Sequence, residues 1–152
     1  FERGSFKVPE AGLTHKQGRF DKEGKGLAAK VAQDVASIYN SMVMCCFVLP
    51  YMNLHMIAEV LNLVTGFDYD RVELLKAGER ISNLQRLFNI HCGMQRADDI
   101  LPPRLLEPVQ EGGAAGKVPD LEYQLKEYYQ ARGWNADGKP TKEKLVELEL
   151  EE

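Results

Sequence analysis

Three observations predict an all-α, multihelical domain of about five helices for this 152-residue chain. Apolar residues recur three or four positions apart in each long segment, which is the period of an amphipathic helix. Capping residues and glycines bound these segments. No convincing run of alternating apolar and polar residues predicts a strand. The length suits one domain that buries about two-thirds of the unfolded chain's surface.

The composition argues against several kinds of partner. A formal charge of -4 and the lack of a dense Lys/Arg block give no electrostatic footprint for nucleic acid or an anionic membrane. The sequence has no charged-then-apolar leader and no apolar run of the length that a membrane span needs, about 20 residues. Three cysteines, two of them adjacent, argue against a disulfide framework, and we expect a cytoplasmic protein.

Residues 1–23 are polar and broken by glycine and proline, so they predict an irregular N-terminal arm. We expect the helical domain to occupy residues 24–152. Its first helix is predicted to begin near Gly24 to Gly26, with one apolar face made of Ala28, Val31, Val35, Ile38 and Met42. This face continues into an apolar stretch, residues 40–50, and Pro50 should end or kink the helix.

Four further helices are expected. They cover residues 52–65, about 70 to 93, about 120 to 133, and a last segment capped by Thr141. The long third helix is predicted to bury Leu74, Ala77, Ile81, Leu84 and Phe88. Gly78 within it costs about 1 kcal/mol relative to Ala, so another element should pack close to its backbone. Residues 94–119 are rich in proline and glycine and predict a surface excursion.

The stretch of residues 40–50 is apolar on every side and carries the adjacent Cys45 and Cys46. Because it is too short to span a membrane, we expect it to form the centre of the core. Its thiols are either inert core residues or part of a metal or electron-transfer site. Neighbouring side chains on a helix diverge by about 100°, which disfavours a self-contained zinc site. One cysteine could still complete a cluster whose other ligands lie on another segment.

An unbroken first helix would also separate the two thiols. Cys45 would lie within about 20° of Ile38 around the helix axis, and Cys46 about 80° away. Only one of them could then face a given site.

Other polar and aromatic groups are predicted to be structural. Asp98 and Asp99 could form a general acid and base, but a turn or helix cap suits them better. Glu79 and Arg86 are expected on a solvated helix face rather than in a buried ion pair. The aromatic cluster near Trp134 should pack a C-terminal helix on its neighbour. The chain has no P-loop, dinucleotide-binding fingerprint, nucleophile elbow or His-Glu-x-x-His motif.

An ordered set of motifs along most of the chain resembles the C-terminal part of the tungsten-containing aldehyde ferredoxin oxidoreductase family. The set comprises Gln33-Asp34, Asn40-Ser41-x-x-x-Cys45-x-Phe47, Gly78-Glu79-Arg80-x-x-Asn83-Leu84-x-Arg86, Arg96-x-Asp98-Asp99-x-Leu101-Pro102 and Tyr128-Tyr129-x-x-Arg132-Gly133-Trp134. Each motif is weak alone, but their order is specific. The resemblance implies an all-helical fragment of a larger enzyme.

In that family the corresponding short motif reads Asp-x-x-Gly-Leu-Cys. Its Cys is the fourth thiolate ligand of a 4Fe-4S cluster, and neighbouring residues contact a pterin of the tungsten cofactor. The resemblance therefore implies Cys45 as the cluster ligand and Asn40 and Met44 as pterin contacts. This sequence has Asn40 for Asp, Val43 for Gly and Met44 for Leu. Asn brings no charge to a pterin, and Val takes a left-handed turn less readily than Gly.

Two functional hypotheses follow. In the first, the parent enzyme oxidises aldehydes to carboxylic acids at a tungsten-pterin centre and passes electrons through the cluster to ferredoxin. The resemblance places the other cluster cysteines and most of the pterin site in upstream domains. The isolated chain should then hold no cofactor, no catalytic residue and no activity. The alternative is a non-catalytic helical interaction or scaffold module related to that family, with Cys45 as a core residue.

Either hypothesis leaves a surface that other domains would cover. If it is bare, an apolar patch around residues 42–47 should be exposed and the chain should tend to self-associate.

Overall fold

The computed structural model describes residues 7–151, apart from the side chains of residues 46, 49 and 50. The described residues contain no strand and five α-helices: α1 (Lys25–Ser41), α2 (Leu54–Thr65), α3 (Arg71–His91), α4 (Leu121–Arg132) and α5 (Lys142–Glu147). Short 3-10 turns occupy Pro9–Ala11, Cys46–Tyr51, Arg96–Asp98 and Pro103–Leu106. The predicted all-α fold of about five helices is confirmed. No described helix is long and apolar enough to cross a membrane.

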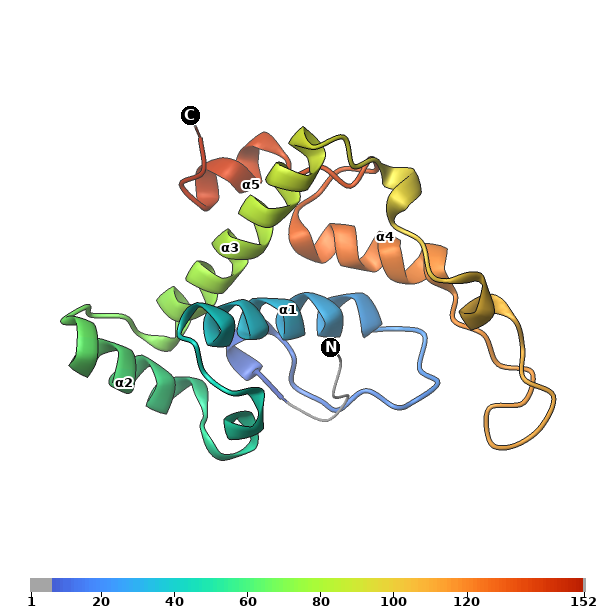
Figure 1. Cartoon of the computed structure of the whole chain (residues 1–152), viewed down its shortest axis with the longest axis horizontal. Coiled ribbons are helices and arrows are strands. Elements are labelled where there is room, and N and C mark those ends of the chain that lie inside the picture. Colours follow the sequence, from blue (N-terminus) through green and yellow to red (C-terminus); the bar gives the residue numbers. More distant parts are fainter. Residues whose placement is uncertain (1–6, 152) are drawn as a thin grey trace.

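Helix α1 lies at the centre of the molecule. Helix α4 runs beside it and α3 crosses it, and these two pairs make the most extensive helix contacts. Figure 1 shows α2 at the N-terminal end of α3 and α5 beside the same helix, farther along. Residues 94–119 run outside the helical body as the predicted excursion.

Local capping explains where the helices begin and end. The carboxylate of Asp70 accepts hydrogen bonds from the Val72 and Glu73 amides at 2.7 and 2.8 Å. Asn53, Asp120 and Thr141 cap α2, α4 and α5 in the same way. Helices α2 and α4 end at glycines 66 and 133, both with left-handed backbone angles.

The start of α1 is capped from another helix. Gly24 is left-handed and its helix has no side-chain cap of its own. Instead, the carboxylate of Glu127 on α4 accepts hydrogen bonds from the amides of Gly24 and Gly26 at 2.6 and 2.5 Å. A negative carboxylate also suits the positive end of the helix dipole. The two helices are thereby joined at the start of α1.

Two glycines let the helices approach closely. A Cβ atom at Gly78 would collide with the carbonyl group of Asp34 on α1. A Cβ atom at Gly26 would likewise collide with the backbone of α4 at Tyr128. The predicted close approach at Gly78 is confirmed, and it explains why α3 carries glycine in its interior.

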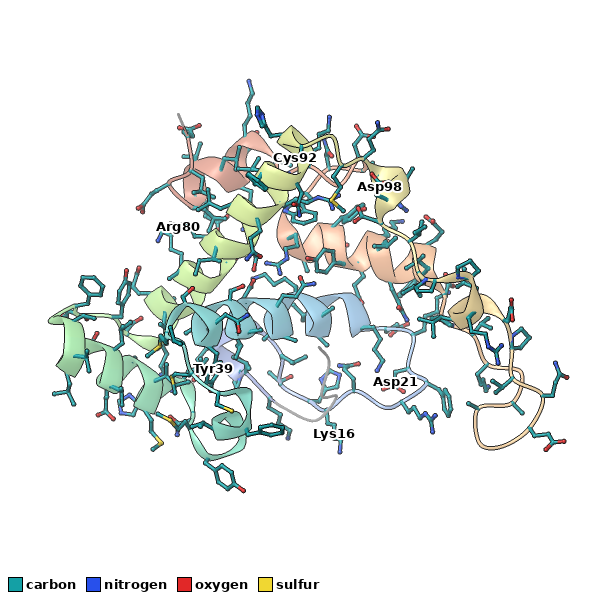
Figure 2. The ribbon with its side chains drawn as sticks, viewed as in Figure 1. Lys16, Asp21, Tyr39, Arg80, Cys92 and Asp98 are labelled. Atoms are coloured by element: carbon teal, nitrogen blue, oxygen red, sulfur yellow. The ribbon has the colours of Figure 1, made fainter. Side chains whose placement is uncertain are left out.

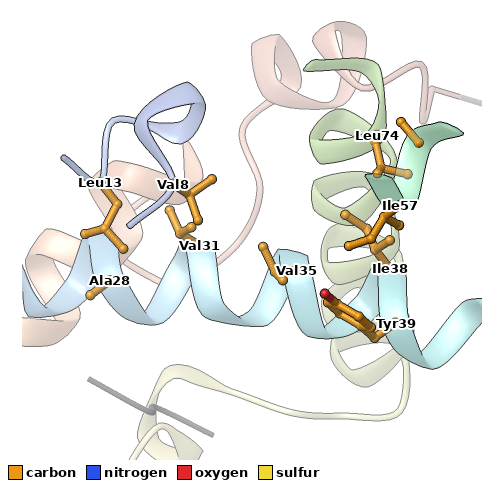
Figure 3. Packing of buried hydrophobic residues seen from close by; sticks show 10 residues of the cluster. Val8, Leu13, Ala28, Val31, Val35, Ile38, Tyr39, Ile57 and Leu74 are labelled. Carbon is orange, nitrogen blue, oxygen red and sulfur yellow. The ribbon is translucent and has the colours of Figure 1, made fainter. Parts of the chain in front are cut away.

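The hydrophobic core forms along one side of α1 and includes its predicted face, with Met42 half-buried at the end (Figure 3). Ile57 of α2 and Leu74 of α3 complete one end of this core. At the other end lie Val8 and Leu13, whose backbones exchange hydrogen bonds at 2.9 and 3.1 Å. The described part of the N-terminal arm therefore contributes to the core, whereas residues 1–6 lie outside the described residues.

The prediction that the apolar stretch forms the centre of the core was wrong. Helix α1 ends at Ser41, well before Pro50, and Val43, Phe47 and Tyr51 are 92%, 67% and 82% exposed. The chain turns away after Met42, and these three side chains lie largely at the surface. The predicted angle between Cys45 and Cys46 assumed that both lie on one unbroken helix, and it fails because α1 ends at Ser41. The side chain of Cys46 lies outside the described part of the chain.

The predicted buried stripe of α3 was also partly wrong. Leu74 is buried, but Leu84 and Phe88 are exposed, whereas Asn83 and Arg86 are buried. The side of α3 that faces the rest of the fold carries polar groups, and these find partners on distant segments. Glu79 and Arg86 therefore do not lie on the solvated face expected for them.

We predict that Gly78→Ala destabilises the chain by about 2 kcal/mol, because the added methyl group would force α3 away from α1. In an exposed helix the same change would stabilise by up to about 1 kcal/mol. Chemical denaturation should measure the difference. The control is Gly113→Ala, where a new Cβ meets no atom within 4 Å. A Gly78→Ala variant as stable as the original chain would contradict this packing.

Candidate functional site

The turn that follows α1 contains the sequence-predicted site residues. Val43 has a left-handed backbone, with φ of 56°. Its amide donates to the Asn40 carbonyl at 3.2 Å, and the Met44 amide donates to the Tyr39 carbonyl at 2.9 Å. This pair of bonds is a Schellman motif, which commonly has glycine at the left-handed position. We call residues 40–45 the α1 turn.

The side chains of the α1 turn differ in how far they are exposed. Asn40, Val43 and Cys45 are exposed, whereas Met44 is half-buried and packs against the hydrophobic core. The structure thus brings three of the four motif residues to the surface on one short turn. The hypothesis of Cys45 as a core residue is wrong, because its thiol is exposed.

A metal site needs more ligands than the α1 turn provides. Among residues 7–151 no group of three or more His, Cys, Asp and Glu side chains could hold a metal ion. Cys92, the other described thiol, lies at the C-terminal end of α3, far from Tyr39 beside the α1 turn (Figure 2). An exposed Cys45 fits the role of a single cluster ligand, and the other thiolates of a 4Fe-4S cluster would have to come from outside the described residues.

A buried charge network joins α1, α3 and α4. Arg132 of α4 is 0% exposed and forms an ion pair with Asp34 of α1, which is 2% exposed. The hydroxyl of Ser82 on α3 donates to the same carboxylate at 3.0 Å, and Lys30 lies 3.0 Å from its other oxygen. Arg132 also donates to Gln33 at 2.8 Å. These groups serve packing, since each charge faces a partner within the fold.

Glu79 extends this network from α3 to α5. Its carboxylate lies 2.8 Å from the ammonium of Lys30 and 3.3 Å from that of Lys144, the second contact lacking hydrogen-bond geometry. Burial acts to raise the pKa of Glu79, but the two lysines outweigh it and the pKa is lowered. Glu79 is therefore held as a carboxylate between two cations, which does not suit a proton-transfer catalyst.

A second network replaces the acid-base pair considered for Asp98 and Asp99. Asp98 caps a 3-10 turn through the Gln95 amide at 2.7 Å, as the structural interpretation predicts. Asp99 instead accepts two hydrogen bonds from Arg86, at 2.9 and 2.6 Å. The hydroxyl of Tyr129 donates to the same carboxylate. The two carboxyl groups thus have separate structural roles.

The ionisation of this second network follows from its geometry. Burial acts to raise the pKa of Asp99, but the hydrogen bonds from Arg86 and Tyr129 hold it below its ordinary value. Burial and the bond to Asp99 raise the pKa of Tyr129 to about 12. The aromatic cluster packs as predicted: Trp134 lies 5.4 and 5.8 Å from the rings of Tyr128 and Tyr129, and its indole donates to buried Asn83 at 2.8 Å.

Sequence reasoning missed most of these polar partners. Pairs such as Asp34 with Arg132 are 98 residues apart, so no local spacing reports them. Ionisable residues on otherwise apolar helix faces were the one sign in the sequence of these buried pairs. A charge on such a face requires a partner when it is buried.

Exposed apolar side chains lie on the α1 turn, on the residues that follow it and on α2. We define the outer apolar surface as the exposed Val43, Phe47 and Tyr51 together with four side chains of α2, which are Met56, Val60, Leu63 and Val64. Met56, Val60 and Leu63 follow a helical spacing and line a shallow depression with Glu59 and Asn62. Within residues 42–47 the described Val43 and Phe47 are exposed, in the direction of the expected patch, and further exposed apolar side chains lie on α2.

Comparison with known proteins decides the family. Residues 2–150 match the family model of aldehyde ferredoxin oxidoreductase, domains 2 and 3. The chain belongs to the aldehyde ferredoxin oxidoreductase family. The predicted resemblance is thereby confirmed.

Several curated proteins are similar to this member of the aldehyde ferredoxin oxidoreductase family. The tungsten-containing aldehyde ferredoxin oxidoreductases of Pyrococcus furiosus and Thermococcus kodakarensis are 41% and 38% identical over 122 residues, which is 79% of this chain and 20% of each relative. The aliphatic sulfonate oxidoreductase WOR-like subunit of Pyrococcus furiosus is 35% identical over 78% of the chain and 20% of its own length. The chain spans about a fifth of the length of these relatives.

One solved structure shares the fold. It is a chain of the BamBC active-site complex of benzoyl-coenzyme A reductase with 1,5-dienoyl-CoA, with a TM-score of 0.71 and 25% sequence identity. The match covers 95% of this chain and 24% of that chain. The helical arrangement therefore also occurs within a longer chain.

We predict that acid selectively weakens the Asp99 network. A lowered pKa means that the carboxylate stabilises the fold above the unfolded pKa of about 4, and that this stabilisation is lost as pH falls further. Asp99→Asn should cost about 3 kcal/mol at pH 7, since it leaves Arg86 without its charge partner. It should also flatten the dependence of unfolding free energy on pH below about 4. Asp137→Asn, at an exposed site, is the control; matching pH profiles for both variants would contradict the assignment.

We predict that the chain self-associates through the outer apolar surface. Sedimentation should show the average mass rising with concentration, and a hydrophobic dye should bind. Leu63→Lys should weaken both effects without unfolding the chain, because Leu63 is 85% exposed. Ile100→Lys adds the same charge on the excursion and should change neither. A clean monomer that binds no dye would refute this.

Proposed function

We propose that this chain is the C-terminal helical part of a tungsten-pterin, iron-sulfur oxidoreductase that oxidises aldehydes to carboxylic acids and passes electrons to ferredoxin. The match of residues 2–150 to the family carries this proposal. The relatives of 38–41% identity, which are named tungsten-containing aldehyde ferredoxin oxidoreductases, support the cofactor and the substrate class.

Cys45 is the proposed fourth ligand of the 4Fe-4S cluster. When bound, the tungsten-pterin centre and the cluster supply the oxidation and electron-transfer chemistry. The chain's own part is to present the thiolate at the surface, on a turn whose position is set by α1. The exposure of Cys45 and of the nearby Val43 supports this role, since a buried cysteine could not meet ligands from another domain.

The two proposed pterin contacts are placed differently. The exposed amide of Asn40 can both donate and accept hydrogen bonds, which suits a polar heterocycle. Met44 was expected as the second contact, but its half-buried side chain packs on the core. We propose Asn40 as the residue that meets the pterin and Met44 as support for the turn.

The proposed partners follow from this assignment. Upstream domains of the same polypeptide would cover the outer apolar surface and supply the remaining cluster ligands and the aldehyde site. Ferredoxin would accept the electrons in the cytoplasm. We propose no nucleic-acid or membrane partner, and we expect the isolated chain to hold no cofactor and to show no aldehyde oxidation.

A non-catalytic scaffold module is the second candidate. The substitutions at Asn40, Val43 and Met44 favour it, because Val43 projects an exposed isopropyl group where the family motif has glycine. The two candidates differ in one measurable property, which is the presence of a cluster bound through Cys45.

We predict that Cys45→Ser in the full-length protein weakens or converts its iron-sulfur cluster, since serine is a poorer ligand than a thiolate. Cys46→Ser is the matched control and should leave the cluster signal unchanged. Visible absorption and electron spin resonance should follow the cluster. An intact four-iron signal in both variants would remove the cluster-ligand role, and loss in Cys46→Ser alone would move it by one residue.

A further inference from the structure

The α1 turn adopts a conformation that its own sequence disfavours. Val43 is left-handed, and the left-handed region is a genuine outlier for a β-branched residue because its side chain crowds the backbone. Val43 is also 92% exposed, so its side chain gains almost no packing in return. Something other than Val43 must hold this turn in place.

The end of α3 shows the same turn without strain. Gly93 occupies the left-handed position there, with φ of 98°. The Gly93 and Met94 amides donate to the carbonyls of Ile90 and Asn89, both at 2.9 Å. Helices α1 and α3 therefore end in the same hydrogen-bond pattern, and of these two ends only the one at Val43 places a β-branched residue in the left-handed position.

The residues on either side of Val43 supply the compensation. Met42 and Met44 are both half-buried and pack against the core, and Tyr39 beneath the turn is 2% exposed. The Met44 amide is bonded to the Tyr39 carbonyl at 2.9 Å, so backbone and side chain of Met44 are both anchored. A hydrophobic contact between these two positions is a usual companion of the Schellman motif.

Cys45 follows this anchor directly. Its backbone is extended, with φ of -69° and ψ of 131°, and its carbonyl accepts a hydrogen bond from the Val48 amide at 3.0 Å. The residue is thus fixed on both sides while its thiol faces outward. The position of the thiol depends on whether the α1 turn stays closed.

We infer that Met44 is a positioning residue for the Cys45 thiolate: it holds closed a turn that Val43 strains. The inference rests on the proposed function for the role of the thiolate, but not for the mechanics of the turn. Met44 thereby acts on the cluster through the backbone, without contacting it.

Hydrogen exchange in the isolated chain tests the turn itself. Met44→Ala should speed exchange of the Met44 and Val48 amides at least tenfold relative to the Ile57 amide in α2. Met44→Leu, which keeps an apolar anchor, should restore protection. Val43→Gly should slow exchange by about tenfold, because it removes the strain, and should rescue protection when combined with Met44→Ala. Unchanged exchange in Met44→Ala, or faster exchange in Val43→Gly, would overturn the inference.

Cluster spectroscopy in the full-length protein tests the positioning role. Met44→Ala should change the spin-resonance signal or lower the cluster content, and Met44→Leu should restore both. An unaltered cluster in Met44→Ala overturns positioning, provided that Cys45→Ser does disrupt it. If Cys45→Ser leaves the signal intact, the proposed function fails instead, while the exchange results still report on the turn.

Discussion

The ion pair between Asp34 and Arg132 is the interaction on which the helical arrangement depends. Both side chains are almost completely buried, and they connect the central helix α1 to α4. Removing either partner would leave an uncompensated charge inside the protein, which costs about 3–5 kcal/mol. Ser82 brings α3 to the same carboxylate, so three helices share one electrostatic centre. The shared contacts at Asp34 limit how α3 and α4 can be placed against α1. The apolar core packs around α1 within that arrangement.

The sequence predicted those elements whose determinants are local. The apolar face of α1, the Asp70 cap and the close approach at Gly78 depend on residues within a few positions or on one glycine's missing side chain. The buried side of α3 could not be predicted in this way, because Asn83 and Arg86 are paired with groups on distant segments. Periodicity identified the apolar residues of α3 but not which of them another element would cover.

The candidate site also has one feature that the sequence predicted and others that it did not. A resemblance in the motif around Cys45 pointed to the residue, and the exposure of its thiol agrees with a ligand role. The conclusion that an apolar stretch must be core was wrong because α1 ends at Ser41 and Val43 and Phe47 lie at the surface. Val43 illustrates the remaining gap: its type argues against a left-handed turn, yet the packing of Met44 on the core outweighs that preference.

The cap that Glu127 provides for α1 joins residues far apart in the sequence, and this affects when the cap can form during synthesis. Its carboxylate lies 103 and 101 residues beyond the two amides that it binds. At a synthesis rate of about 5–20 residues per second, Glu127 is made about 5 to 20 seconds after those amides. The cap on the first turn of the central helix can therefore form only after most of the domain has been made.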